Sequence, residues 1–224
     1  MSASASTYSY AQIIQAIRAE SIKINIEYPT DGDGRITSSI KETEYLSLLE
    51  TGLKETHPQL EFETQPRERH WWDFRVNKIP FNLKLTTGGT DNAFNKVAII
   101  YSISGIEIKN KNMNYNKFFK ILKEYPKKDT RDRMTEYHYL VINKTNANVL
   151  LKSIFDIHSY KSNPSNDLQI DWSNEFKNID FVIPDANIKE KIQQLIKTIQ
   201  ISVQKAIAGM IEFANADIDI EFPK

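Results

Sequence analysis

The sequence of 224 residues contains no cysteine. A disulfide framework, a thiolate zinc site and a cysteine nucleophile are therefore excluded together. The chain also lacks an apolar run near the roughly 18 residues of a membrane helix, and its first ten residues have neither the basic region nor the apolar core of a secretion signal. These absences lead us to expect a cytoplasmic protein.

An excess of charge of one sign is also missing, because 29 Lys and Arg residues balance 29 Asp and Glu residues. Net charge thus gives no general reason to bind nucleic acid or an anionic membrane. The distribution is less even, since Lys109–Lys128 holds seven lysines and a single glutamate. This segment fits a solvated helix face or a phosphate-contacting surface, and the sequence favours neither.

Several motifs of common enzymes do not occur. No P-loop and no Gly-x-Gly-x-x-Gly turn is found, so a nucleotide-binding fold is not indicated. His57, His70, His138 and His158 lack the spacing of metal ligands. The segment 101–105 contains serines but does not have the pattern of a nucleophile elbow. Nucleophilic hydrolase chemistry therefore has no support.

Hydrophobic periodicity indicates alternating helices and strands. We expect helices at 10–19, from Ser38 or Ser39 to 56, at 93–104 and at 185–213, and strands at 22–28, 60–65, 71–76, 79–87, 136–143, 149–157 and 168–172. This order predicts the α/β class, with a central mixed β-sheet flanked by helices. The long C-terminal helix has one apolar stripe, which suits a core position or a subunit interface equally well.

The most informative stretch is a predicted β-hairpin at 71–87, with a tight link at Asn77-Lys78. Side chains alternate along a strand, so Asn82 and Lys84 share one face of the second strand while its apolar residues share the other. Asp73 lies on the first strand, and cross-strand neighbours are about 5 Å apart. A carboxylate, an amide and an ammonium group are thus expected to converge.

A second acidic residue is expected near this hairpin. The helix that ends near 56 has an apolar face containing Tyr45 and Leu46, and one turn earlier Glu42 lies on the same inward face. A carboxylate near a helix N-terminus is favourable by itself, by some tenths of a kcal/mol. Glu42 therefore has either this structural role or a functional one.

The spacing Asp73, eight residues, then Asn82-Leu83-Lys84 resembles the PD-(D/E)xK nuclease motif of type II restriction endonucleases. The order of an inward Glu, a hairpin with Asp and a strand with Lys is also similar to that family's core, over about 38–104. The segments 79–86 and 163–172 look like parts of small restriction enzymes, among them rare cutters of AT-rich sites. The resemblance implies one endonuclease domain over 1–224.

This resemblance implies a Mg²⁺-dependent, site-specific enzyme that hydrolyses phosphodiester bonds in double-stranded DNA. It further implies a homodimer, and a cognate DNA methyltransferase in the same restriction-modification system. Asp73, Asn82 and the Leu83 carbonyl correspond to metal ligands, and Lys84 to the group that stabilises transition-state charge. Asn82 departs from the family's acidic residue, so the resemblance implies that Glu42, or Glu44, supplies the missing carboxylate.

DNA contacts are less clearly marked in the sequence. Asn reads adenine edges and Lys or Arg contacts phosphates, which makes polar residues after the catalytic strand candidates. The candidates are Thr87, Asn92, Asn95, Lys96, Arg131 and Arg133, with Asp91 beside them. Solvated surface explains each of these residues equally well.

Three other interpretations remain open. Asp73 and Lys84 could form an ordinary ion pair on a hairpin surface. The replacement of an acid by Asn82 is also compatible with a DNA-binding protein that has lost catalysis. A nuclease of the same superfamily acting in repair or in mobile-element processing is the third.

Overall fold

The computed structural model describes residues 8–27, 34–66, 70–108, 113–125 and 130–215, with side chains in the second range described from residue 40. Within these ranges no helix has the combination of length and apolarity needed to cross a membrane. The sequence Asp31-Gly32-Asp33-Gly34 also predicts a turn, but its first three residues lie outside the described residues, as do parts of the lysine-rich segment.

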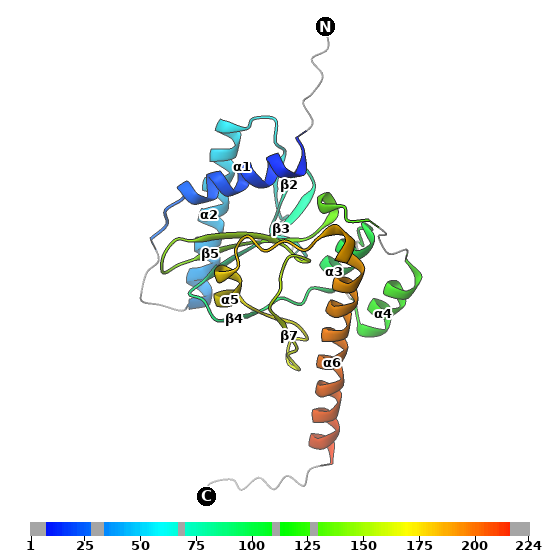
Figure 1. Ribbon diagram of the computed structural model, residues 1–224. Coiled ribbons are helices and arrows are strands. Elements are labelled where there is room, and N and C mark those ends of the chain that lie inside the picture. The colour runs from blue at the N-terminus through cyan, green and yellow to red at the C-terminus, as the bar shows by residue number, and fades with distance from the viewer. Residues whose placement is uncertain (1–7, 28–33, 67–69, 109–112, 126–129, 216–224) are drawn as a thin grey trace, which may run out of the picture.

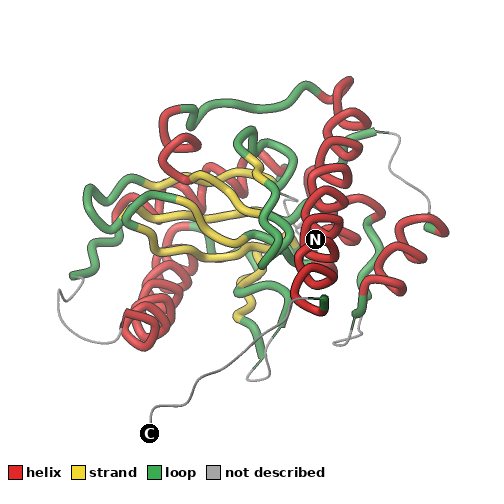
Figure 2. Tube along the Cα trace, turned by 90° about the horizontal axis from the view of Figure 1, so that it is seen from below, coloured by secondary structure: helices red, strands yellow, loops and turns green. Residues whose placement is uncertain are grey.

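A mixed five-stranded sheet lies at the centre of the molecule (Figure 2). Its strands, in spatial order, are β1 (Phe62–Thr64), β2 (Phe74–Val76), β3 (Ile79–Thr86), β5 (His138–Asn143) and β6 (Val149–Ser153). The β3–β5 pair is parallel and the other pairs are antiparallel. The predicted mixed central sheet is thus confirmed.

Helices cover both faces of this sheet (Figure 1). One face packs against α1 (Tyr10–Lys23) and α2 (Gly34–Thr56), and the other against α3 (Lys96–Ser104), α4 (Tyr115–Glu124) and α6 (Ile188–Ala214). The alternation of side chains along β3 explains the first layer, because its apolar residues all point to the α1–α2 side. The predicted α/β class with flanking helices is confirmed.

A second, three-stranded sheet joins segments that are distant in the sequence. It consists of β4 (Thr90–Asn92), β8 (Gln169–Asp171) and β7 (Tyr160–Lys161), in that spatial order and antiparallel throughout. The short helix α5 (Trp172–Lys177) follows β8 directly. The segment 163–172 therefore lies beside the residues that follow β3.

The β2–β3 turn matches its prediction. Asn77 and Lys78 both have positive φ, at 47° and 69°, which is the backbone of a type I′ hairpin turn. The Asn77 side chain also accepts a hydrogen bond of 2.8 Å from the Glu61 backbone N–H. This contact connects the turn to the chain just before β1.

Two N-terminal predictions are wrong. The expected strand at 22–28 begins inside α1, which continues to Lys23 after a capping box between Ser9 and Gln12. Residues 24–27 form no regular element, and Ile22 is exposed. The helix expected to start at Ser38 or Ser39 begins at Gly34 instead. In both cases local patterns of Ile and Ser were overridden by longer helices.

Other boundaries differ by a few residues. The turn expected after β3 contains β4, and α3 begins at Lys96 rather than at residue 93. The strands β5, β6 and β8 are each shorter than expected. The 3₁₀ helices η1 (Arg133–Thr135) and η2 (Asp185–Asn187) precede β5 and α6. Strand ends are set by pairing partners, which the sequence of one strand does not reveal.

Candidate functional site

Asp73 directly precedes β2 and lies beside β3. Its backbone N–H donates to the Phe81 carbonyl at 2.9 Å, which continues the antiparallel pairing. Its side-chain Oδ2 then accepts from the Leu83 backbone N–H at 2.8 Å and from Asn82 Nδ2 at 2.7 Å. A carboxylate thus replaces a backbone carbonyl as the acceptor for β3. The two strands separate here because the next partner is a side chain.

The face of β3 opposite α1 and α2 carries Asn82 and Lys84, as predicted, and both are half-buried. Leu83 lies between them, with its side chain buried on the other face. The N–H and C=O groups of one residue leave a strand on the same side, so the Leu83 carbonyl faces the same side as Asp73. Lys84 forms no hydrogen bond or ion pair with any described residue, so its ammonium group remains available.

Helix α2 adds Glu42 to this site. The pKa of Glu42 is raised from its ordinary 4.5 to about 7, first by burial and second by the Asp73 carboxylate, while Lys84 opposes the shift. Glu42 therefore lies within electrostatic range of both hairpin residues. Glu44 does not, because it is exposed and forms an ion pair with Lys41 at 2.8 Å. Of the two glutamates, Glu42 is therefore the one near the hairpin residues.

The site has more acidic than basic groups. Burial also raises the pKa of Asp73, against the opposing effects of the Leu83 N–H and Lys84. Asp91 in β4 contributes to the raised pKa of Glu42, so β4 delivers a third carboxylate to this region. Three carboxylates near two lysines, Lys84 and Lys144, create a place that favours an added cation or proton.

Tyr137 is a residue of this site that the sequence did not reveal. Its hydroxyl hydrogen-bonds with the Asn82 side chain, and burial followed by the Asp73 charge raises its pKa well above the usual value. Tyr139 is the register partner of Asn82 across the parallel β3–β5 pair, and Tyr137 precedes it on the same face. In the sequence, only the period-two pattern of β5 could have suggested that Tyr137 faces this site. That pattern does not identify β3 as the neighbouring strand.

The oxygen atoms of the site suit a hard cation only in part. Asn82 Oδ1 is buried and has no hydrogen-bond partner among the described residues, which makes it an acceptor that a cation could satisfy. It is the amide nitrogen, however, that faces Asp73. No three His, Asp or Glu residues in the described ranges form a ready-made metal cluster. A cation here would also use amide, carbonyl and water oxygens.

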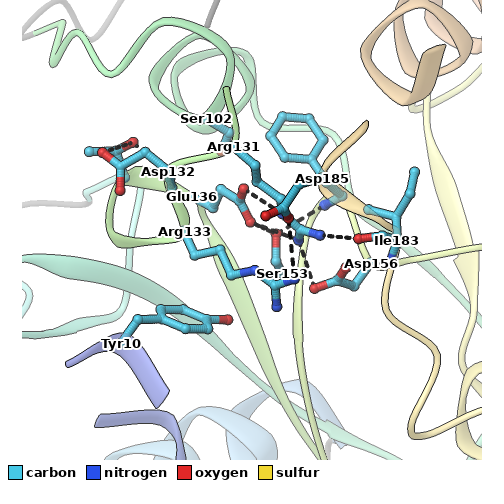
Figure 3. Close-up of polar contacts among 12 residues, drawn as sticks. Tyr10, Ser102, Arg131, Asp132, Arg133, Glu136, Ser153, Asp156, Ile183 and Asp185 are labelled. Carbon is cyan, nitrogen blue, oxygen red and sulfur yellow. Dashed lines mark hydrogen bonds and ion pairs between the residues drawn. The ribbon is translucent and has the colours of Figure 1, made fainter. Parts of the chain in front are cut away.

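Arg131 corrects one prediction, because its side chain is completely buried and cannot contact DNA on the surface. Figure 3 shows it directed into a cluster with Glu136 and Asp156. Nε and Nη2 donate to the two oxygens of Glu136 at 2.9 and 3.0 Å, and Nη2 lies 2.8 Å from Asp156 Oδ2. Nη1 donates to the Ile183 carbonyl at 2.8 Å. Arg131 is therefore a structural residue.

Arg133 lies at the edge of the same cluster (Figure 3). Its guanidinium group is partly exposed, 3.6 Å from Asp185 and over the ring of Tyr10. Tyr10 in turn contacts His138 Nε2 at 3.0 Å. Arg133 thus links α1 to the segment before α6, although part of it remains accessible.

Asn95 also has a structural role instead of the expected DNA contact. Its Oδ1 accepts from the backbone N–H groups of Val97 and Ala98, which makes it the N-cap of α3. Its Nδ2 donates to the Trp71 carbonyl at 2.9 Å. All polar atoms of this side chain are occupied, and the cap anchors α3 to the hairpin.

The remaining DNA-contact candidates lie on accessible surface. Thr87 and Asn92 are exposed on either side of the turn that leads into β4. Lys96 is half-buried, with its ammonium group 4.2 Å from the centre of the Tyr115 ring and 5.2 Å from that of Phe94. These three residues therefore belong to the segment that runs from the end of β3 to the first residue of α3.

No known protein-family model matches the chain, and no curated protein matches it at a significant level. Any assignment of function must therefore come from the residues of the site itself.

Proposed function

We propose that the chain is a type II site-specific deoxyribonuclease that hydrolyses phosphodiester bonds in double-stranded DNA with Mg²⁺. The observation that carries this proposal is the convergence of Asp73, Asn82 and Lys84 on one end of a hairpin, with Glu42 presented from α2. These groups come from separate elements, which is unusual for an ordinary hairpin ion pair. Asp73 and Lys84 in fact form no direct ion pair within the described residues.

Mg²⁺ prefers carboxylate, amide and carbonyl oxygens. The Asp73 carboxylate, Asn82 Oδ1 and the Leu83 carbonyl would hold it, with Glu42 directly or through water. When bound, Mg²⁺ lowers the pKa of a coordinated water and neutralises charge on the phosphate. Asn82 would first have to rotate its amide, because its nitrogen now faces Asp73.

Two side chains act on the reacting groups. Lys84 places an ammonium group on the face shared with Asn82, where it stabilises the negative charge that develops on the phosphate. Glu42, if it holds the cation through a water molecule, would accept a proton from that water as it attacks. Asp73 stays oriented by its hydrogen bond from the Leu83 N–H.

The surroundings of the site determine how DNA would approach. Thr87, Asn92 and Lys96 lie just beyond the catalytic strand and are the candidates for contacts with bases and phosphates. If the recognition site is palindromic, its two equivalent strands match the two-fold symmetry of a homodimer. A cognate DNA methyltransferase would protect the host's own sites.

One observation favours a second candidate, a sequence-specific DNA-binding protein without catalysis. Asn82 Nδ2 donates to Asp73 Oδ2 at 2.7 Å, so the carboxylate is already stabilised without a cation. An acid in place of Asn82 would repel Asp73 and require the metal. The same fold could therefore persist after the loss of metal binding.

The test is incubation of the purified protein with unmethylated plasmid or phage DNA, with Mg²⁺ or with excess chelator, followed by gel electrophoresis. We expect discrete fragments that vanish with chelator and with Lys84→Ala, while Lys54→Ala cleaves normally. Lys54 is a matched control because it is exposed at the far end of α2. Intact DNA with specific binding retained favours the silent protein, and the absence of both cleavage and binding contradicts the nuclease.

A further inference from the structure

Helix α6 is anchored to the body of the protein by its first half only. Ile188, Ile192, Leu195 and Ile199 are buried and belong to the core between the sheet and α3 and α4. They recur at intervals of three or four residues, so they form one stripe along the helix. This stripe is a continuous apolar contact through about three turns.

The same stripe continues into the outer half of α6 without a covering partner in the described chain. Figure 1 shows this end projecting beyond the rest of the molecule. Ile207 is 51% exposed, Met210 68%, Ile211 57% and Phe213 70%. Most other large exposed apolar residues are scattered singly or in pairs, so this is the largest such group among the described residues.

The composition of the outer half does not suit a helix surrounded by water. The six residues from 206 to 211, Ala-Ile-Ala-Gly-Met-Ile, include no polar side chain. A helix that is apolar on all sides is normally buried. The helix would therefore gain free energy from any apolar partner that covers it.

The spacing of the apolar residues points to another helix as the partner. Beyond the buried part of α6, Val203, Ala206, Met210 and Phe213 follow one another at alternating steps of three and four residues, with Ile207 and Ile211 beside them. This is the a/d spacing by which helices pair in coiled coils. The pattern favours a helix of similar length over a flat surface or an extended strand.

We propose that the outer half of α6 is a dimerisation element and pairs with the same segment of a second copy of this chain. The choice of a second copy rests on the proposed function, because two copies match the two-fold symmetry of a palindromic site. A two-fold interface is self-complementary, and one apolar helix stripe meets this condition by pairing with itself. The chain has no net charge, so two copies do not repel each other.

The surface available is close to that of a specific interface. With Phe213 offering at least about 100 Å² and the three aliphatic side chains each roughly the same, the four exposed side chains present about 400 Å² of apolar surface per copy. Two copies would therefore bury about 800 Å² at the centre alone. Biological interfaces exceed about 1,000 Å², a value reached once the flanking side chains of α6 are included.

The test compares the molar mass of the full chain and two variants by light scattering over a range of concentrations. Ile207→Glu/Met210→Glu places two charges on the stripe. Lys205→Glu, on the opposite side of α6, changes the net charge by the same amount and is the matched control. All three positions are exposed, so unchanged circular dichroism is expected for both variants.

We expect the wild type and Lys205→Glu to have twice the mass of the chain, and the double variant to be monomeric. A monomeric wild type, or a double variant that stays dimeric, overturns the proposal. So does a wild-type monomer that binds vesicles through α6. The mass does not depend on cleavage, so a dimer without nuclease activity would leave this interface intact and contradict only the proposed function.

The absence of cysteine allows a second readout. Met210→Cys places a single thiol on the stripe, and Lys205→Cys places one on the opposite side of the helix. We expect a bifunctional thiol cross-linker to join two copies of the first variant more than tenfold more efficiently than the second. Equal cross-linking of the two variants contradicts pairing through the stripe.

Discussion

Asn82 decides how the centre of the site is stabilised. Its amide donates to Asp73, which allows a partly buried carboxylate to persist without a cation. Tyr137 adds a hydroxyl on the same face. The neutral side chain therefore stabilises the metal-free protein, but it lacks the charge that would attract a metal.

The hydrogen bond between Asn82 and Asp73 predicts the behaviour of Asn82→Asp. The variant brings two carboxylates together where a 2.7 Å hydrogen bond now exists, so we expect it to lose about 1–3 kcal/mol of stability in chelator. We expect Mg²⁺ to restore much of this loss, and DNA cleavage to be kept or increased. Thermal unfolding with and without Mg²⁺ measures the first effect. A variant that Mg²⁺ does not stabilise would argue against a cation between these residues.

Glu42 predicts a particular pH dependence of stability. Burial first, and Asp73 second, raise its pKa from 4.5 to about 7. Between these pH values the folded protein holds a proton that the unfolded chain has released, so this residue makes stability fall as pH rises. Glu42→Gln cannot release the proton, and we expect its stability to fall less between pH 4.5 and 7.

Urea unfolding at several pH values measures this difference. Lys84, Asp91 and Lys144 also face Glu42 electrostatically and remain in the variant. Glu44→Gln is the control, because Glu44 is exposed and paired with Lys41. Parallel stability curves for the wild type and Glu42→Gln would contradict the raised pKa.

At the scale of the element, the β2–β3 hairpin holds the site in register. Its turn needs positive φ at both positions, and Lys78 has a φ of 69°. Asn tolerates this conformation better than Lys, and glycine best of all. A side chain at Lys78 is thus a small cost built into the element that carries Asp73 and Asn82.

Lys78→Gly should therefore stabilise the protein. We expect a gain of about 0.5–1 kcal/mol in the free energy of unfolding, because the left-handed conformation costs a non-glycine residue about 1–2 kcal/mol and the extra backbone entropy of glycine offsets about 0.5–1 kcal/mol of that. Urea denaturation measures it. Lys197→Gly, at an exposed position in the interior of α6, is the opposite control and should lose about 1 kcal/mol. A loss of stability at position 78 would show that its side chain makes a contact of greater value.

At the scale of the whole molecule, the buried Arg131 cluster joins segments that are far apart. It connects the residues before β5, the end of β6 and the segment leading to α6 through Glu136, Ser153, Asp156 and Ile183. The Ser153 hydroxyl also donates to Glu136. The guanidinium group of Arg131 therefore helps to hold the segment that leads to α6 against the sheet, together with the buried apolar residues of α6 itself.

Arg131→Met should be strongly destabilising. It leaves the carboxylates of Glu136 and Asp156 buried without their cation, and we expect a loss of about 3–5 kcal/mol. Arg133→Met is the comparison, since its guanidinium group is partly exposed and the expected loss is under about 1 kcal/mol. Chemical denaturation of both variants tests the difference, and equal losses would contradict it.

Local signals explain which parts of the protein were predictable. The hairpin could be predicted from the alternation of side chains and from Asn77 at the turn. Asp73, Asn82 and Lys84 could be predicted to meet because all three belong to that hairpin. Tyr137 reaches the same place only through the parallel β3–β5 pair, which no single segment encodes. The burial of Arg131 likewise depends on Asp156 and Ile183, which are distant in the sequence. The residues next to Arg131 give no local signal that its side chain is buried.

The two neighbours of β3 also imply an order of events during folding. Only Asn77 and Lys78 separate β3 from β2, whereas residues 87–137 separate it from β5. Hairpins form in about 1–10 μs, while parallel pairing must first close a long loop and is slower. The contact of Asp73 with Asn82 therefore belongs to the fast phase. Tyr137 joins these two residues only in the slow phase, so the site around Asp73 is completed last.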